Sequence, residues 1–118
     1  MERMFPVADA HCDFLYYMYH NHYSLKKAAP RQAVALPYLR KGGAAMQFFA
    51  AWVDPDARAS GLQQCLWLID AYYRMLEDCA DAGVIPLSPE FTPEGGKIAT
   101  VLTVEGGEAL MGQEENLR

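Results

Sequence analysis

The sequence has few of the features that would place it in several common classes of protein. It has 10 Lys or Arg against 15 Asp or Glu in 118 residues, so its net charge is −5 and its pI is about 5.0. Its basic residues are scattered, whereas nucleic-acid binding needs clustered cations that neutralise phosphates. No apolar run approaches the ~18 residues that span a bilayer, and residues 1–6 lack the apolar run of a signal peptide. We therefore expect neither a nucleic-acid nor a membrane partner.

Cysteine is also scarce. The three cysteines, Cys12, Cys65 and Cys79, are odd in number, widely spaced and form no CxxC motif. This usage argues against a disulfide framework and predicts reduced thiols in a cytoplasmic protein. The composition, 52% hydrophobic and 21% charged, is that of a globular chain that can bury a core. We expect residues 1–118 to form one unit without an internal domain boundary.

Three apolar segments are typical of strands. A short one is expected within residues 5–13, a second over residues 44–53 after a glycine pair, and a third over residues 98–104, which are rich in β-branched side chains. Residues 84–97 contain three prolines and a glycine pair, which predicts a loop with at most short strand or helix pieces.

One long helix is expected between the second and third strands. Residues 62–82 carry apolar side chains at helical spacing, which predicts a helix with one buried face. Ser60 and Gln63 fit a capping box at its start, and Gly83 is a natural stop. Strands that alternate with helices predict a parallel α/β architecture.

The candidate chemistry lies where strands end. Because side chains alternate along a strand, His11 and Asp13 would face one side and could share a metal ion, with Cys12 pointing elsewhere. Asp9 would lie on the same face and could orient a ligand. Glu105 ends the third strand, and in parallel α/β barrels catalytic groups gather at the carboxyl ends of strands. The alternative is a polar strand end and a solvated loop carboxylate.

Other polar and aromatic residues have simpler interpretations. His20 and His22 could bind a metal ion as an H-x-H pair, but they lie in a polar segment where a solvated surface role is favoured. Gln47 interrupts the second apolar strand, as a buried hydrogen-bonding group or, the interpretation we favour, as a polar residue of a barrel interior. Trp52 and Trp67 are expected to be packing residues.

Three segments together resemble the renal (membrane) dipeptidase family of zinc metallopeptidases. They are residues 9–13 (DAHCD), 39–49 (LRKGGAAMQFF) and 96–107 (GKIATVLTVEGG), in the order and at separations similar to those of the family. The resemblance implies a partial (β/α)₈ (TIM) barrel of about three parallel strands, with residues 1–118 as its N-terminal part. It also implies a hydrolase that cleaves dipeptides with water activated by two Zn²⁺ ions.

The resemblance also assigns roles to individual residues. His11 and Asp13 would hold the first zinc ion, and Glu105 would be the catalytic carboxylate that bridges both. The family takes its other zinc-binding histidines from later strands, and His20 and His22 do not match them. We therefore expect at most a partial zinc site in these 118 residues, and no dipeptidase activity from them alone.

An alternative function comes from another class of protein. The chain could be a small α/β scaffold or interaction module that self-associates and retains a remnant metal site. A third interpretation is purely structural, without metal at the strand ends. Right-handed crossovers would place the second strand in the middle and leave two open edges, which are sites for pairing with another chain. We therefore expect a homo-oligomer formed through open sheet edges.

Overall fold

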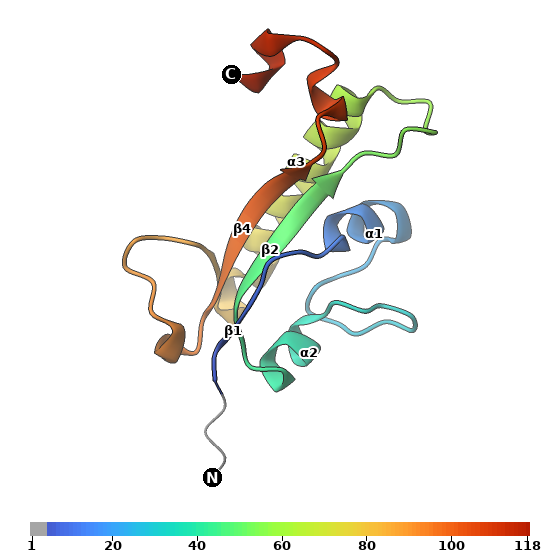
Figure 1. The fold of residues 1–118 in the computed structure, drawn as a ribbon. Coiled ribbons are helices and arrows are strands. Elements are labelled where there is room, and N and C mark those ends of the chain that lie inside the picture. Colours follow the sequence, from blue (N-terminus) through green and yellow to red (C-terminus); the bar gives the residue numbers. More distant parts are fainter. Residues whose placement is uncertain (1–4) are drawn as a thin grey trace.

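A parallel sheet organises the fold. The computed structural model describes residues 5–118, in which four strands follow the spatial order β1-β2-β4-β3 (Figure 1). The strands are β1 (Val7–Asp9), β2 (Ala44–Trp52), β3 (Val84–Pro86) and β4 (Ile98–Glu105). All three pairings are parallel, and β2 lies between β1 and β4 as expected.

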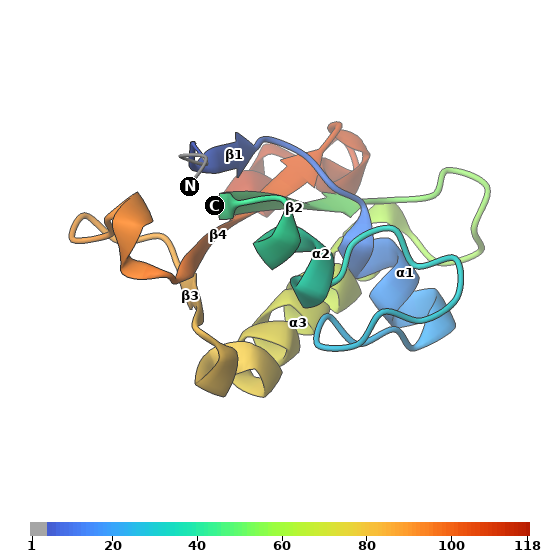
Figure 2. The same ribbon diagram turned by 90° about the horizontal axis from the view of Figure 1, so that it is seen from below.

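The helices in residues 5–118 all lie against one face of this sheet (Figure 2). They are α1 (Phe14–Asn21), α2 (Leu36–Lys41) and α3 (Gly61–Cys79). This arrangement confirms the expected parallel α/β class. Within the described residues, no helix has the combination of length and apolar character needed to cross a membrane.

The long helix α3 forms for the reasons visible in the sequence. Ser60 is its N-cap, and the Ser60 hydroxyl accepts a hydrogen bond from the backbone N–H of Gln63 at 3.1 Å. The regular helix ends at Cys79, and one 3₁₀ turn continues the chain to Gly83, whose φ of 77° is left-handed. The predicted helix is confirmed, with its last turn wound more tightly than an α-helix.

The core lies between the sheet and the helices. Phe49 of β2 is 0% exposed and packs edge-on against Phe14 of α1, with ring centroids 6.1 Å apart. Tyr72 of α3 also packs against Phe49, with ring centroids 6.3 Å apart. The Tyr72 hydroxyl also lies 2.8 Å from Thr100 Oγ1 of β4, and Thr100 donates to the carbonyl of Ile85 in β3. One buried cluster therefore joins α1, α3 and three strands.

Gln47 lies on the helix-covered face, and the barrel-interior interpretation is wrong. Gln47 is in register with Thr100, whose hydroxyl contacts α3, and it shares its face of β2 with Phe49. Its side chain is 0% exposed and donates hydrogen bonds to the carbonyls of Phe48, at 3.1 Å, and Asp9, at 3.5 Å. The buried hydrogen-bonding interpretation is correct, because the amide links β2 to the end of β1.

The sheet edges differ from the expectation of two fully open edges. Residues 84–97, expected to be a loop with at most short strand or helix pieces, contain the short strand β3, which pairs with the first three residues of β4, Ile98–Thr100. Leu87 extends this contact by donating to the Thr100 carbonyl at 2.9 Å. On the side away from β2, residues 101–105 of β4 lack a neighbouring strand, and so do the outer edges of β1 and β3 within the described residues.

The segment after β4 is anchored to the start of α3 at Gly61. It forms two 3₁₀ turns, Glu108–Leu110 and Glu114–Leu117. A Cβ added at Gly61 would lie 2.5 Å from the backbone oxygen of Glu108 and 3.3 Å from the backbone nitrogen of Ala109. The approach is backbone to backbone, so a side chain at this position cannot move aside.

We expect Gly61→Ala to destabilise the protein by about 1–3 kcal/mol, the usual cost of overpacking. Helix propensity alone predicts the opposite sign, a gain of about 1 kcal/mol for Ala over Gly. The measurement is urea unfolding followed by circular dichroism. Gly107→Ala is the matched control, because Gly107 has an ordinary negative φ and nothing within 4 Å of an added Cβ. A stabilised Gly61→Ala variant would contradict the close approach.

Candidate metal centre

His11 and Asp13 lie in the turn between β1 and α1, not on the strand. β1 ends at Asp9, so strand alternation does not align the two side chains, and that part of the prediction is wrong. Backbone hydrogen bonds hold the turn instead. Asp9 Oδ1 accepts from the His11 N–H at 3.3 Å, and Ala50 of β2 donates to the Cys12 carbonyl at 3.0 Å. Asp9 thus orients the His11 backbone and not its ring.

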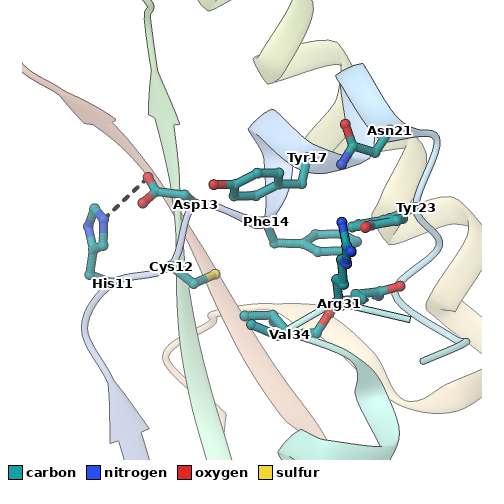
Figure 3. Close-up of a pocket in the computed structure, with 11 residues that line it drawn as sticks. His11, Cys12, Asp13, Phe14, Tyr17, Asn21, Tyr23, Arg31 and Val34 are labelled. Atoms are coloured by element: carbon teal, nitrogen blue, oxygen red, sulfur yellow. Dashed lines mark hydrogen bonds and ion pairs between the residues drawn. The ribbon is translucent and has the colours of Figure 1, made fainter. Parts of the chain in front are cut away.

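Asp13 directs its carboxylate away from the helix that it begins. It occupies the N-cap position of α1, yet its side chain makes no capping hydrogen bond. An Asp at this position usually accepts from the free N–H groups of the first helical turn. Here Asp13 Oδ1 lies 3.4 Å from His11 Nε2 (Figure 3). The carboxylate is therefore available to a ligand beside His11.

Glu105 reaches the same place from β4. It is the last residue of the strand and lies an odd number of positions from Thr100, whose side chain contacts α3. Alternation therefore points Glu105 to the face of β4 opposite to that of Thr100. Glu105 Oε2 lies 3.5 Å from His11 Nε2. Gly106, with a φ of 78°, turns the chain immediately after this carboxylate.

The three side chains meet as the sequence predicts. One ligand atom from each of His11, Asp13 and Glu105 lies within 4.8 Å of the others. Tetrahedral zinc with bonds of about 2.0–2.2 Å holds its ligands about 3.3–3.6 Å apart, which matches the separations of 3.4 Å and 3.5 Å from the imidazole. One imidazole and two carboxylates are ordinary zinc donors, so this set fits the ion. All three residues are exposed, which leaves room for further ligands.

Cys12 is not part of this donor set, although it lies between two members of it. Its side chain points away from His11 and is buried (Figure 3). Burial, with smaller contributions from nearby carboxylates, raises the pKa of the Cys12 thiol to about 12. The group is therefore a protonated thiol at neutral pH and a poor metal ligand. Cys65 and Cys79 are also free and buried.

His20 and His22 do not approach the three metal-binding candidates. His20 lies on α1 against the rings of Tyr16 and Tyr19, with centroids 4.3 Å and 5.1 Å away. His22 follows α1 with a left-handed φ of 55°. Among the described residues, only His11, Asp13 and Glu105 form a potential metal-binding group. The two later histidines have no metal partner within residues 5–118.

Aromatic side chains line a cavity beside the two carboxylates. A cavity of about 330 Å³ is lined by Asp13, Tyr16, Tyr17, Trp52 and Glu105. The rings of Tyr16 and Trp52 pack edge to face with their centroids 5.3 Å apart, so the packing role expected of Trp52 is correct. The site residues predicted from the sequence do not include these aromatic side chains. The available signal was that Trp52 ends a strand, as Glu105 does.

Comparison with known proteins decides the family. The sequence profile of the membrane dipeptidase family, peptidase family M19, matches residues 1–118. The chain belongs to this family. The membrane dipeptidase resemblance of the three segments is thereby confirmed, and the match extends over the entire chain. No curated protein matches it.

A solved structure supports the same fold. The chain is similar to a crystal structure described as the dipeptidase AC, a metallopeptidase of family M19, with a TM-score of 0.67 and 21% sequence identity. The similarity covers 88% of this chain and 38% of that one. The chain thus spans well under half the length of its M19 neighbour. Its parallel α/β sheet is a partial (β/α)₈ barrel, as expected.

Proposed function

We propose that residues 1–118 form the N-terminal part of a zinc-dependent dipeptidase. His11 and Asp13 would hold one zinc ion, and Glu105 would be shared between two. The observation that carries the proposal is that these three side chains converge within 4.8 Å although they come from the β1–α1 turn and from the end of β4, 92 or more residues apart in sequence. M19 membership supports peptide hydrolysis as the reaction.

Zinc bound at this centre would polarise a peptide carbonyl and activate a water molecule. The residues of this chain prepare the site for that chemistry. Glu105 offers two hard oxygens, so it can bind two cations and neutralise part of their charge. The backbone contact from Asp9 fixes His11 before any ligand arrives. The packed rings of Tyr16 and Trp52 form one side of the cavity and exclude water from that side.

The first experiment is a zinc titration of the purified 118-residue chain by calorimetry. We expect about one weakly bound ion per chain, because three protein ligands hold an open site. His11→Ala should weaken binding by at least about 10-fold, since it removes the donor that both carboxylates face. His20→Ala is the matched control and should bind as the unaltered chain does. Equal zinc affinity in the His11→Ala chain would contradict the proposed centre.

The same preparation tests whether the isolated chain is active. We expect no useful hydrolysis of an L,D-dipeptide even with added zinc. Residues 5–118 offer no ligands for a second ion beyond the shared Glu105, so half of the proposed water activation is missing. Zinc-dependent turnover that Glu105→Gln abolishes would contradict this expectation.

A second candidate function, self-association, is favoured by the open edges. Residues 101–105 of β4 pair with β2 on one side but with no described strand on the other, and Val104 there is 49% exposed. Light scattering after size exclusion should show a dimer or larger species at micromolar concentration. Val104→Lys should shift it toward the 13.2 kDa monomer, whereas Leu66→Lys, at a similarly exposed position on α3, should not. A single monomeric species at every concentration would contradict self-association.

A further inference from the structure

A second cavity lies next to the candidate metal centre but extends away from it. Its volume is about 590 Å³, and it is bounded by the β1–α1 turn, by α1 and by residues 31–34 (Figure 3). His11 and Asp13 form one end. Phe14, Tyr17 and Val34 contribute to its walls, and most of its lining is apolar. Nothing in the metal chemistry of His11 and Asp13 accounts for the remainder of this cavity.

Arg31 is the cation of this cavity, at the end remote from His11 (Figure 3). It stands in a turn that begins at Ala29 and is closed by a hydrogen bond from the Gln32 N–H to the Ala29 carbonyl at 3.0 Å. Pro30 takes the second position, and Arg31 takes the third with a left-handed φ of 67°. Gly or Asn is favoured at that position, because a left-handed conformation strains a larger residue.

The loop is built so that this strained conformation persists. Gln32 is 5% exposed and satisfies three backbone groups: it accepts from the Ala29 N–H at 3.1 Å and donates to the carbonyls of Ser24, at 2.8 Å, and Val34, at 2.9 Å. The Arg31 side chain itself has no hydrogen bond or ion pair with any residue in 5–118. The side chain therefore makes no polar contact that would offset the strain, and strain of this kind gathers at functional sites.

We propose that this cavity binds a carboxylate carried on an apolar body, with the Arg31 guanidinium pairing the carboxylate. Guanidinium and carboxylate form two parallel charge-assisted hydrogen bonds. The apolar body would lie against the side chains of Phe14, Val34 and the buried Cys12. The lining holds one arginine and one carboxylate, Asp13, so a monoanion suits it better than a multiply charged phosphate. Carboxylate binding at Arg31 requires no metal ion, so its test is independent of the zinc proposal.

The experiment is a titration of the ¹⁵N-labelled chain, followed by NMR in the presence of EDTA. The probes are N-acetyl-L-phenylalanine, its uncharged amide and inorganic phosphate. We expect the carboxylate probe to shift the Arg31 side-chain signal and the amides of Phe14, Tyr17 and Val34 in a saturable manner. The amide probe and phosphate should each bind at least about 10-fold more weakly, because one lacks the charge and the other lacks the apolar body.

Substitutions at Arg31 separate a ligand-binding role from a structural one. Arg31→Gln should bind the carboxylate probe at least 10-fold more weakly. Arg31→Gly should lose binding to the same extent but raise Tm by about 3 °C, because glycine relieves the left-handed strain. Arg58→Gln, which alters an exposed arginine outside this cavity, is the control and should bind normally.

Several results would overturn the proposal. The first is unchanged probe affinity in Arg31→Gln. The second is chemical-shift changes that map outside the cavity lining, or no saturable change with the carboxylate probe. The third is phosphate or the amide binding as tightly as the carboxylate, which would leave a general anion site or a purely apolar one. A fall in Tm for Arg31→Gly would show that the arginine is retained for stability.

Discussion

On the proposed mechanism, replacing Glu105 by Gln in a dipeptidase that contains residues 1–118 is expected to reduce dipeptide hydrolysis by about 10³-fold or more, with the sheet still folded. The amide has one weakly basic oxygen and no charge, so it cannot be shared between two zinc ions as the carboxylate can. A loss of about 4 kcal/mol of transition-state stabilisation corresponds to that factor. The fold should tolerate the change, because Glu105 is exposed at the end of β4.

The measurement is kcat/KM for an L,D-dipeptide in a zinc-loaded dipeptidase that contains residues 1–118 together with the later barrel strands that the proposal requires. Glu108→Gln is the matched control, since Glu108 is an exposed acid in the next turn and is not part of the metal-binding group. Circular dichroism of the two variants should be indistinguishable. Residual activity of Glu105→Gln within tenfold of the unaltered enzyme would remove Glu105 from the proposed mechanism.

Phe49→Ala is expected to destabilise the chain by about 3–5 kcal/mol. Phe49 is fully buried and is the side chain through which β2 contacts both Phe14 of α1 and Tyr72 of α3. The cost combines lost transfer free energy with the cavity that remains between the two helices. Because a domain of this size is stable by only about 5–15 kcal/mol, such a loss can unfold a large fraction of the molecules.

Urea unfolding followed by tyrosine and tryptophan fluorescence measures this loss. Phe5→Ala is the control, because Phe5 is 81% exposed and should change the free energy of unfolding by less than about 0.5 kcal/mol. A cost below about 1 kcal/mol for Phe49→Ala would mean that the cavity collapses without penalty. In that case the described packing of α1 and α3 on β2 would need revision.

The candidate metal centre was predictable in its members but not in its construction. His11, Asp13 and Glu105 follow apolar segments, and carboxyl ends of parallel strands share one edge of a sheet. That reasoning needs only the direction of the strands. The turn that positions His11 depends instead on two hydrogen bonds. The His11 N–H donates to Asp9, and Ala50 of the neighbouring strand β2 donates to the Cys12 carbonyl. Alternation along β1 therefore led to the correct pair for the wrong reason.

Gln47 shows why the faces of a buried strand are hard to assign. Residues 44–52 are apolar on both sides, so the sequence has no alternation that distinguishes the helix-covered face from the open one. The structure resolves this through the register with Thr100 and through the hydrogen bond from Gln47 to Asp9. Strand β3 was similarly hidden, because three residues among prolines acquire strand geometry only by pairing with β4.

The sequence by itself determined the features that depend on near neighbours: α3 with its Ser60 cap and Gly83 stop, the two long apolar strands, and the identity of the acidic and imidazole donors. These follow from side-chain periodicity and local capping, which act over a few residues. Only the tertiary structure decided where distant backbone segments touch. The contact of Gly61 with Glu108, the face on which Gln47 lies and the cavity lined by Arg31 all join residues from separate segments. Their geometry is set by packing between elements, which no local pattern encodes.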